Sequence, residues 1–407
     1  MTDLQKFYEE WNNGQDLLLV HTSGSTGAPK PLWVEKRRML NSSRITCDFL
    51  GIKPGDTALL CLPLDYIAGK MMVVRSIERN LSLTSVTPDN HPLRSIIEQC
   101  RQNGTAPESV RITLAAMVLS QVYCSLQDAE ERSMLMQIKH LIIGGGSIPS
   151  DLEQQLQHFP NGVWSTYGMT ETLSHIALRR LNGTESDRWY TPFENVNISI
   201  STEEERKEER AETKEQRGKS REQRAESREE RAESKERRRG CLIIHAPQVC
   251  SHPLTTNDIA ELHDDGRRFR IIGRKDNVIC SGGIKIQAEE VEETLQQFIP
   301  YPIAITRLPD VKFGEIVVLL IGSEREENGK SKEQRAERKE EREKGKEQRG
   351  KSKEELEEAL KNAFSHLHKY AIPKRIIHTE SIPRTETGKT DRAKCLQLAL
   401  QTATQDQ

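Results

Sequence analysis

The sequence of 407 residues lacks three features that would each point to a particular class of protein. Its net charge is only −2, so no global field draws it toward nucleic acid or an anionic membrane. No hydrophobic run approaches the length of a membrane span, and the opening segment MTDLQKFYEEWNNGQD has no apolar signal core. The eight cysteines include no C-x-x-C pair and no Cys/His cluster with zinc-finger spacing. We therefore expect buried or free thiols, a cytoplasmic location, no nucleic-acid partner and no membrane span.

The low hydrophobic fraction of 35% and the high charged fraction of 30% have a local cause. Residues 202–239 hold 27 charged residues among 38, and residues 324–354 hold 22 among 31. The remaining sequence is about 22% charged, which is ordinary for a globular protein.

The first charged tract repeats with a period of seven residues from Arg210 to Arg237. The repeat has no Leu, Ile or Val that could form a coiled-coil seam, and its acidic and basic side chains nearly balance. We predict that both tracts are solvated low-complexity insertions in surface loops, with a protein- or RNA-binding role as the alternative.

Outside the tracts, short apolar runs alternate with amphipathic stretches. The runs are residues 16–20, 57–63, 82–86, 111–117 and 140–146, and the amphipathic stretches include Pro92–Gln102 and Asp151–His158. Such alternation predicts an α/β domain with a mostly parallel sheet.

The pattern changes after the first tract. Residues 259–274 predict a β-hairpin with Asp265-Gly266 at its turn, residues 288–298 predict an amphipathic helix, and residues 315–322 predict a strand. We therefore predict a large α/β domain over residues 1–272 and a smaller α+β domain over residues 273–407.

The most informative motif is HTSGSTGAPK, which follows the first apolar run. It is not a Walker A sequence, but Gly24 and Gly27 would let backbone N–H groups approach an anion, and Lys30 supplies positive charge. Four hydroxyl side chains add hydrogen-bond donors: Thr22, Ser23, Ser25 and Thr26. A polar surface turn is the alternative, but the motif favours a phosphate-binding loop.

This loop resembles the phosphate-binding signature of the adenylate-forming enzymes, which include acyl- and aryl-CoA ligases, peptide-synthetase adenylation domains and luciferases. Four further segments resemble motifs of that family in the family's order: STYGMTET (165–172), TNDIAEL (256–262), GRKDNVICSGGIKIQAEEVEETL (273–295) and PRTETGKTDR (383–392). The resemblance implies the adenylate-forming fold, here shortened at its N-terminus, with a mobile C-terminal domain.

The resemblance also implies a reaction. A carboxylate would attack the α-phosphate of ATP to give an acyl-adenylate and pyrophosphate, and the acyl group would then pass to coenzyme A. Thr170 would donate to the α-phosphate, Glu171 would hold Mg²⁺, and Lys389 would bridge the acyl carboxylate and the α-phosphate. Considered alone, Glu171 could be a helix N-terminal acid and Lys389 an exposed surface lysine.

Further positions carry over from the same motifs. Asp258 would bind the ribose hydroxyls with Arg274 nearby, and Asn257, where the family has glycine, could keep a turn because Asn tolerates positive φ. Asp276 matches the hinge about which the small domain would swing. The other nucleotide-side positions are Gly145, Tyr167, Gly168 and Met169, and the loop facing coenzyme A is Ser281, Gly282 and Gly283.

The sequence indicates the reaction more clearly than it indicates the acid that would be activated. Typical members carry a long portion before the phosphate loop, which here starts at residue 22. This compact plan and the segment 62–77 resemble o-succinylbenzoate–CoA ligases of menaquinone biosynthesis. Larger ligases of that type have L-P-L-x-H-x-S-G in this segment, whereas this sequence has Asp65-Tyr66 and Ala68.

o-Succinylbenzoate has an aromatic ring and a second carboxylate that needs cationic or hydrogen-bonding partners. Tyr66 could stack on the ring, and the candidates for the acyl group and its carboxylate are Lys70, Arg75, Gly146, Ser174 and His175. The alternatives are that Arg75 is a helix-surface charge and His175 a satisfied wall residue. At the level of function, the alternatives are a CoA ligase for another aryl or short acyl acid and an inactive ligase-fold scaffold. The sequence leaves the oligomeric state undecided between a monomer and a homo-oligomer.

Overall fold

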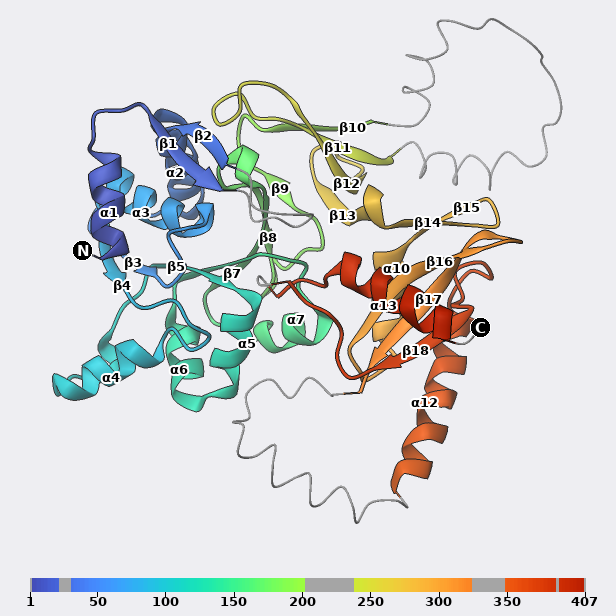
Figure 1. Ribbon diagram of the computed structural model, residues 1–407. Helices are drawn as coiled ribbons and strands as arrows, with labels where there is room; N and C mark the ends of the chain where they lie inside the picture. The colour runs from blue at the N-terminus through green and yellow to red at the C-terminus, as the bar shows by residue number, and fades with distance from the viewer. Residues whose placement is uncertain (1, 22–30, 202–237, 324–347, 386–387, 406–407) are drawn as a thin grey trace, which may run out of the picture. The chain divides into compact units, whose positions relative to one another are not determined.

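The computed structural model describes residues 2–21, 31–201, 238–323, 348–385 and 388–405 (Figure 1). The chain forms two compact units: Met1–Thr256 with Ala260–Arg270, and Asn257–Ile259 with Ile271–Gln407. This division into units does not test the functions predicted for the two domains, residues 1–272 and residues 273–407, which stay predictions.

The first unit is built on a seven-stranded sheet with the strand order β4-β3-β5-β6-β7-β8-β9. The strands from β4 to β7 are parallel, and β8 and β9 are added antiparallel. The predicted mostly parallel sheet is therefore confirmed. Its strands are β3 (Thr57–Leu60), β4 (Ser82–Ser85), β5 (Leu114–Val118), β6 (His140–Gly144), β7 (Gly162–Gly168), β8 (His175–Arg180) and β9 (Thr191–Pro192).

Helices cover both faces of this sheet, with α2 and α3 on one face and α4 to α7 on the other (Figure 1). Alternate residues of one strand, such as Leu141 and Ile143 of β6, join the core under α4 to α7. The predicted amphipathic stretches are α4 and α7. The helices of this unit are α1 (Asp3–Trp11), α2 (Lys36–Leu50), α3 (Ile67–Arg79), α4 (Arg94–Gln102), α5 (Leu119–Gln127), α6 (Ala129–Gln137) and α7 (Ser150–Leu156), with short 3₁₀ turns η1 (Pro107–Ser109) and η2 (Thr170–Thr172).

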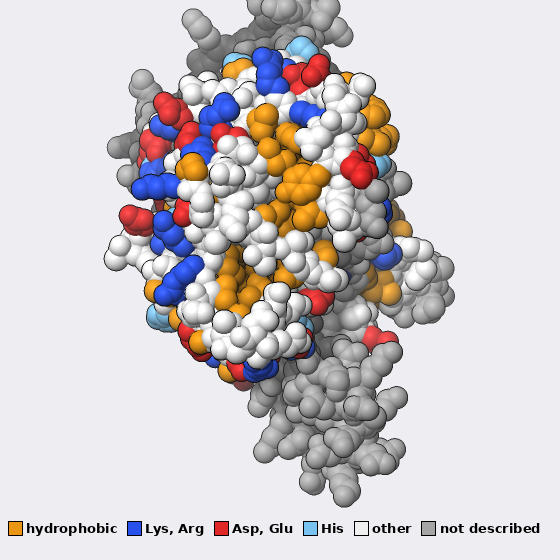
Figure 2. Space-filling model, turned by 90° about the vertical axis from the view of Figure 1, so that its left-hand side faces the viewer, with side chains coloured by type: hydrophobic (Ala, Val, Ile, Leu, Met, Phe, Trp, Pro, Cys, Tyr) orange, Lys and Arg blue, Asp and Glu red, His pale blue; other side chains and the backbone are white. Residues whose placement is uncertain are grey.

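The first apolar run does not join the parallel sheet. It forms β1 (Leu17–His21), which pairs antiparallel with β2 (Pro31–Glu35) in a separate two-stranded sheet, because a short connection favours antiparallel pairing. The register pairs His21 with Pro31, so the two residues that flank residues 22–30 lie side by side. Leu17 and Trp33 are exposed on the outer face of this hairpin, and Figure 2 shows a band of hydrophobic side chains on the side of the unit that carries α1 and β1.

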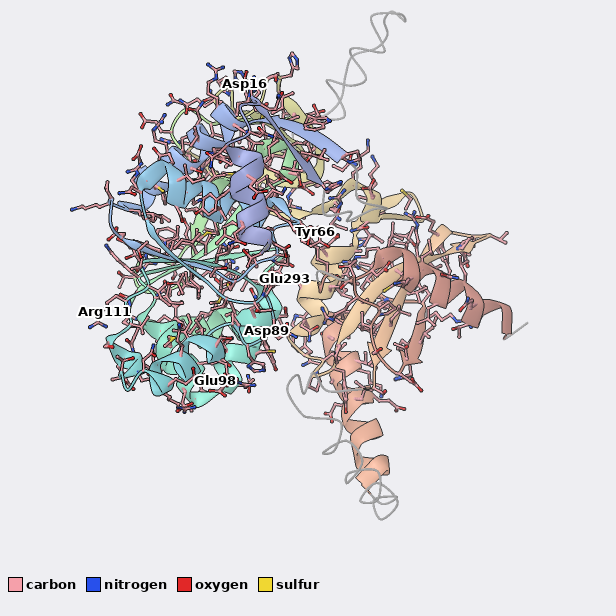
Figure 3. The ribbon with its side chains drawn as sticks, turned by 60° about the vertical axis from the view of Figure 1, so that its left-hand side comes forward. Asp16, Tyr66, Asp89, Glu98, Arg111 and Glu293 are labelled. Carbon is pink, nitrogen blue, oxygen red and sulfur yellow. The ribbon has the colours of Figure 1, made fainter. Side chains whose placement is uncertain are left out.

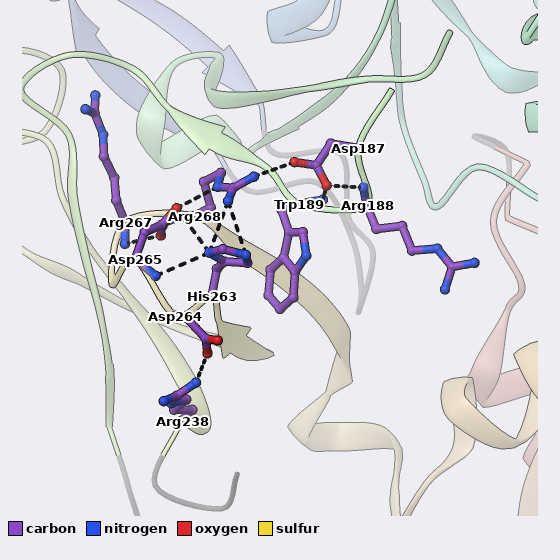
Figure 4. Close-up of polar contacts among 9 residues, drawn as sticks. All are labelled: Asp187, Arg188, Trp189, Arg238, His263, Asp264, Asp265, Arg267 and Arg268. Carbon is purple, nitrogen blue, oxygen red and sulfur yellow. Dashed lines mark hydrogen bonds and ion pairs between the residues drawn. The ribbon is translucent and has the colours of Figure 1, made fainter. Parts of the chain in front are cut away.

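A four-stranded sheet of order β10-β11-β12-β13 contains the predicted hairpin. Its strands are β10 (Asn197–Ser201), β11 (Arg239–His245), β12 (Leu254–Leu262) and β13 (Phe269–Arg274). The turn between β12 and β13 is confirmed at Asp265-Gly266, where Gly266 has φ +67°. Arg268 stabilises the turn by donating from Nε to Asp265 (2.6 Å) and from Nη1 to Asp187 (2.6 Å), as Figure 4 shows.

The second unit has a five-stranded sheet around β17, which pairs antiparallel with β16 and parallel with β18. Both faces of β17 are covered, because Leu319 packs toward α10 and α12 while Leu320 packs toward α13. The helix predicted at 288–298 and the strand predicted at 315–322 are confirmed. The elements are the 3₁₀ turn η3 (Lys275–Asn277), β14 (Val278–Ser281), β15 (Ile284–Gln287), α10 (Ala288–Gln296), β16 (Ile303–Asp310), β17 (Gly314–Gly322), α12 (Gln348–Ser365), β18 (Arg375–Thr379) and α13 (Arg392–Gln405).

The edges of the two charged tracts need correction. Arg239 begins β11 and its guanidinium lies 3.1 Å from the Glu261 carboxylate, so the predicted tract 202–239 extends into the sheet. Residues 348–354 of the predicted tract 324–354 belong to α12. The seven-residue repeat and most of the second tract lie outside the described residues.

All eight cysteines are unpaired, and all except Cys280 are buried, which confirms the expectation of buried or free thiols. Among the described residues, no helix is both long and apolar enough to cross a membrane.

Candidate active site

The carboxyl ends of the parallel strands bring predicted site residues of the first unit to one edge of the sheet. β6 ends at Gly144 and leads into Gly145 and Gly146, while the neighbouring strand β7 ends at Gly168 and leads into Thr170. Gly145 has φ +94°, a backbone conformation that favours glycine. Ligands of open α/β sheets bind at this edge, so the geometry supports a ligand site there.

The phosphate-loop segment starts beside the same edge. His21 forms a parallel bridge with Tyr66, which follows β3 and precedes α3; Tyr66 is labelled in Figure 3. The predicted phosphate-binding residues themselves lie outside the described residues: Thr22, Ser23, Gly24, Ser25, Thr26, Gly27 and Lys30.

The turn after β7 has a tightly constrained backbone. A Cβ atom at Gly168 would collide with the Ser174 carbonyl oxygen, and Leu173 adopts φ +66°. The Thr172 hydroxyl accepts a hydrogen bond from the Met169 N–H at 2.9 Å and lies 2.7 Å from the Ser174 carbonyl oxygen. Sequence reasoning missed Thr172, although its place in the Thr-Glu-Thr segment was a usable signal. A strained residue next to a candidate site supports a functional role for this turn.

Within this turn, Thr170 is buried and Glu171 is exposed. Tyr167, the residue before Gly168 in β7, packs edge-on against Phe269. The described part of the chain holds no cluster of three or more metal-ligating side chains, so Glu171 would supply a single carboxylate. A single exposed carboxylate fits Mg²⁺, which usually keeps several waters and substrate oxygens as its other ligands.

Arg75 of α3 is fully inside the first unit, with 2% of its surface exposed, so the alternative of a helix-surface charge is wrong. Its Nη2 donates to Ser174 Oγ at 2.7 Å, and its Nη1 lies 3.6 Å from the Met72 sulfur. Within the part of the chain that the structure describes, no carboxylate lies within ion-pair distance of it. Burial lowers the pKa of Arg75 to about 10, which leaves it charged at neutral pH.

A chain of hydrogen bonds continues from Arg75 through His175. Ser174 Oγ lies 3.3 Å from His175 Nδ1, and His175 Nε2 lies 3.0 Å from Thr46 Oγ1. Because the Thr46 hydroxyl donates to the Ser42 carbonyl, it accepts from Nε2–H, which leaves Nδ1 to accept from Ser174. Burial and the nearby Arg75 hold the pKa of His175 well below its usual range, so the ring is neutral.

Three of the six acyl-side candidates, Arg75, Ser174 and His175, are thus brought into one cluster. Lys70 has different partners: its Nζ donates to the Leu19 carbonyl at 3.2 Å and lies 4.0 Å from the Glu10 carboxylate. Burial lowers the pKa of Lys70, and Glu10 opposes this shift. Sequence reasoning missed Thr46, which lies on α2 far from His175 in the sequence and carries no motif signal.

In the second unit, the structure brings together motif residues that are far apart in the sequence. Arg274 Nη1 lies 3.4 Å from Asp258 and its Nη2 lies 3.1 Å from Asp276. Lys389 is partly buried, and its pKa lies below the usual range because of burial and repulsion by Arg274, against an opposing effect of Asp258. Asn257 lies inside β12 without a positive φ, so the expected turn at this position is wrong.

The loop predicted to face coenzyme A connects β14 and β15. Ser281 is buried, and Gly282 and Gly283 have φ of +58° and +80°. A Cβ atom at Gly282 would come within 2.7 Å of the Tyr370 ring, so a larger residue would displace that ring.

The class of protein is an adenylate-forming enzyme. One unit is a mostly parallel α/β unit with glycine, threonine and carboxylate positions at its strand ends, and the other is an α+β unit that carries Asp258, Arg274 and Lys389. Residues 4–218, just over half of the chain, match the AMP-binding enzyme family, and the chain belongs to that family. With its relatives, the match identifies an AMP-forming acyl-CoA synthetase, a class of acid–thiol ligase.

Relatives and solved structures agree on the fold. The 2-succinylbenzoate–CoA ligase of Enterococcus faecalis is 25% identical, over 94% of this chain and 70% of that protein. An acyl-CoA synthetase (AMP-forming)/AMP-acid ligase II-like protein from Dyadobacter fermentans is 27% identical with a TM-score of 0.53, covering 96% of this chain and 91% of that one. The o-succinylbenzoate coenzyme A synthetase from Bacillus subtilis, solved with ATP and magnesium, is 19% identical with a TM-score of 0.61, covering 92% and 69%.

Proposed function

We propose that the chain adenylates o-succinylbenzoate with ATP and Mg²⁺ and transfers the acyl group to coenzyme A, as a cytoplasmic enzyme of menaquinone biosynthesis. The ligase class follows from the family, whereas the acid, the location and the residue roles are part of the proposal. The E. faecalis relative is named for this acid.

The observation that carries the choice of acid is the buried guanidinium of Arg75. A buried charge is expensive to maintain, and here no described carboxylate compensates it. A dicarboxylic substrate supplies the missing anion: one carboxylate reacts, and the other is recognised by Arg75, whose guanidinium is held by Ser174 and, through Ser174, by His175. Charge-assisted hydrogen bonds of this kind are about twice as strong as neutral ones.

The remaining roles follow the motifs. Thr170 donates a hydrogen bond to the α-phosphate, and Glu171 holds Mg²⁺, which when bound neutralises phosphate charge. Lys389 bridges the carboxylate and the α-phosphate as charge develops, while Asp258 binds the ribose. Glycines 145 and 146 leave room for the adenine and the acyl group, and the loop from Thr22 to Lys30 binds the β- and γ-phosphates. Asp276 is the hinge between adenylation and thioester formation, for which Ser281 to Gly283 face coenzyme A.

The test is a panel of carboxylic acids assayed for CoA-dependent release of AMP, with o-succinylbenzoate, benzoate, a second aryl dicarboxylate and a short fatty acid. The proposal requires that o-succinylbenzoate gives the highest kcat/KM. Preference for a monocarboxylic acid would refute the assigned substrate but keep the ligase class. Absence of both AMP release and pyrophosphate–ATP exchange with every acid would favour an inactive ligase-fold scaffold.

A CoA ligase for another acid is the second candidate, because the substrate-side segment differs from that of larger o-succinylbenzoate ligases. Tyr66 and Ala68 stand where those ligases carry His and Ser. The same panel distinguishes the two candidates.

A further inference from the structure

The loop that carries Lys389 is closed by its own hydrogen bonds. The Gly388 N–H donates to the Thr385 carbonyl at 2.9 Å, the Lys389 N–H donates to Thr385 Oγ1 at 3.2 Å, and the Asp391 N–H donates to the Pro383 carbonyl at 2.8 Å. These bonds join described residues on the two sides of residues 386–387. The loop is followed directly by Arg392, the residue at which α13 begins.

Arg392 is joined to α10 by a two-pronged ion pair with Glu292. Its Nη2 donates to Glu292 Oε2 at 2.7 Å, its Nη1 donates to the other carboxylate oxygen, and Nη1 also donates to the Ile305 carbonyl at 3.0 Å. Glu292 in turn accepts from the Ile305 N–H. The two side chains are only 26% and 19% exposed, and both Glu292 carboxylate oxygens accept hydrogen bonds from the guanidinium, a two-point geometry that makes the ion pair a rigid connection.

A second carboxylate extends this connection to the hinge segment. Glu289, one helical turn before Glu292, lies 3.6 Å from Arg392 Nη2 and accepts hydrogen bonds from Asn277 and Gln287. Asn277 directly follows Asp276 in the turn η3.

Gln287 completes the path to Arg274. It is buried, and its Nε2 donates to the Arg274 carbonyl at 2.9 Å. The Gln287 and Glu289 side chains lie close to the backbone of Gly273, because a Cβ atom at that position would collide with both of them. The Arg274 side chain then holds Asp258 and Asp276.

We propose that Arg392, Glu292 and Glu289 are positioning residues that fix the Lys389 loop to helix α10. These three residues are called the clamp below. The clamp lets Lys389 keep one position relative to α10 while the part of the chain after the hinge residue Asp276 swings. It therefore preserves the placement of the Lys389 ammonium group, which a flexible loop would lose to conformational entropy. The assignment rests on the proposed adenylation function, because only that function gives Lys389 its task.

The test compares the two half-reactions in Arg392→Gln, Glu292→Gln, the double variant and Arg392→Lys. Adenylation is measured by pyrophosphate–ATP exchange, and thioester formation is measured from supplied acyl-adenylate and coenzyme A. We expect each glutamine variant to lower the kcat of adenylation about 100-fold, the loss associated with a displacement of about 1 Å. The KM for ATP and the rate of thioester formation should each change by less than about threefold, because Lys389 acts on the adenylation transition state.

Two comparisons separate positioning from simple stabilisation. Arg392→Lys keeps one charged donor to Glu292 and should recover part of the lost rate, while the double variant should be no slower than the slower single variant because the two residues act as a pair. Lys394→Gln is the matched control: it removes the same charge from the same helix, but Lys394 is exposed and forms an ion pair with Asp391, its next neighbour but two in the sequence. It should behave as the unsubstituted protein does.

Hydrogen exchange supplies a readout that does not require activity. In folded Arg392→Gln, the amides of residues 383–391 should exchange at least about tenfold faster, while those of β16 and β17 stay protected. If exchange instead rises across the whole unit and both half-reactions fall together, the ion pair only stabilises the fold and the clamp is wrong. Unchanged exchange in the loop overturns it as well. Should the unsubstituted protein show no pyrophosphate exchange, the proposed function fails, and the exchange of residues 383–391 alone decides whether the clamp holds the loop.

Discussion

Replacing Arg75 by methionine should make the protein more stable and, at the same time, worse at using a dicarboxylic acid. Burial lowers the pKa of Arg75 to about 10, far below that of an ordinary arginine. Since a tenfold change in acidity corresponds to about 1.4 kcal/mol, the folded state carries a cost on the order of 3 kcal/mol for keeping this group charged. The cost is fully present below the folded-state pKa and disappears as pH rises through the higher unfolded-state value.

The substitution also removes the 2.7 Å hydrogen bond to Ser174, which is worth about 1 kcal/mol. The free energy of unfolding at pH 7 should therefore rise by about 1 to 2 kcal/mol, which urea denaturation resolves. Methionine fills a similar volume without a charge, so a large cavity does not form.

Substrate use should respond in the opposite direction. Loss of a charge-assisted contact to a carboxylate costs about 2 to 3 kcal/mol, so kcat/KM for o-succinylbenzoate should fall about 30- to 150-fold. Benzoate, which has no second carboxylate, should lose less than about threefold. Pyrophosphate–ATP exchange at varied acid concentration measures both values.

Arg79→Met is the matched control. Arg79 lies one turn further along α3 and pairs with Asp48 at 2.7 Å near the surface, so its loss should destabilise slightly without changing the preference between acids. The reasoning about Arg75 is refuted if Arg75→Met destabilises the protein and lowers the use of both acids equally, since Arg75 would then be a structural residue.

Four other predictions concern separate parts of the molecule. Lys389→Ala should abolish adenylation yet leave CoA transfer from supplied acyl-adenylate largely intact; equal loss of both steps would contradict its role. Deleting residues 202–237, which keeps the Arg239 end of β11, should leave turnover within a few-fold, and complete inactivation would show that the tract matters for catalysis. Gly168→Ala should destabilise by about 2 kcal/mol or more because its Cβ would meet a backbone oxygen, and a thermal melt unchanged within error would argue against that crowding. Burial, with repulsion from neighbouring cations, lowers the pKa of His140 to about 4, so stability should fall as pH drops from about 6.5 toward 4, and His140→Phe should flatten that slope in urea titrations at several pH values.

The Arg239–Glu261 pair illustrates why the tract boundaries were misplaced. Composition treats Arg239 like the charged residues before it, but strand β11 begins at this residue, and Arg239 has the Glu261 carboxylate as a partner. The same applies to α12, which begins within a segment whose composition matches that of the tract. Composition averages over a window, whereas a strand or helix ends where its last backbone partner is found.

Sequence alone determined the class of protein, because binding a triphosphate and a magnesium ion requires particular residue types in short local motifs. It also determined the positions of β3, β5, β6, α4 and α10, since each buries a face whose hydrophobic period can be read locally. Tertiary structure alone decided that Arg75 is buried without a described carboxylate, that Thr46 orients His175, and that Arg392, which follows the Lys389 loop, is joined to α10. Burial and hydrogen bonding of these side chains depend on residues that lie far away in the sequence, and no local pattern records which distant neighbours a side chain will meet.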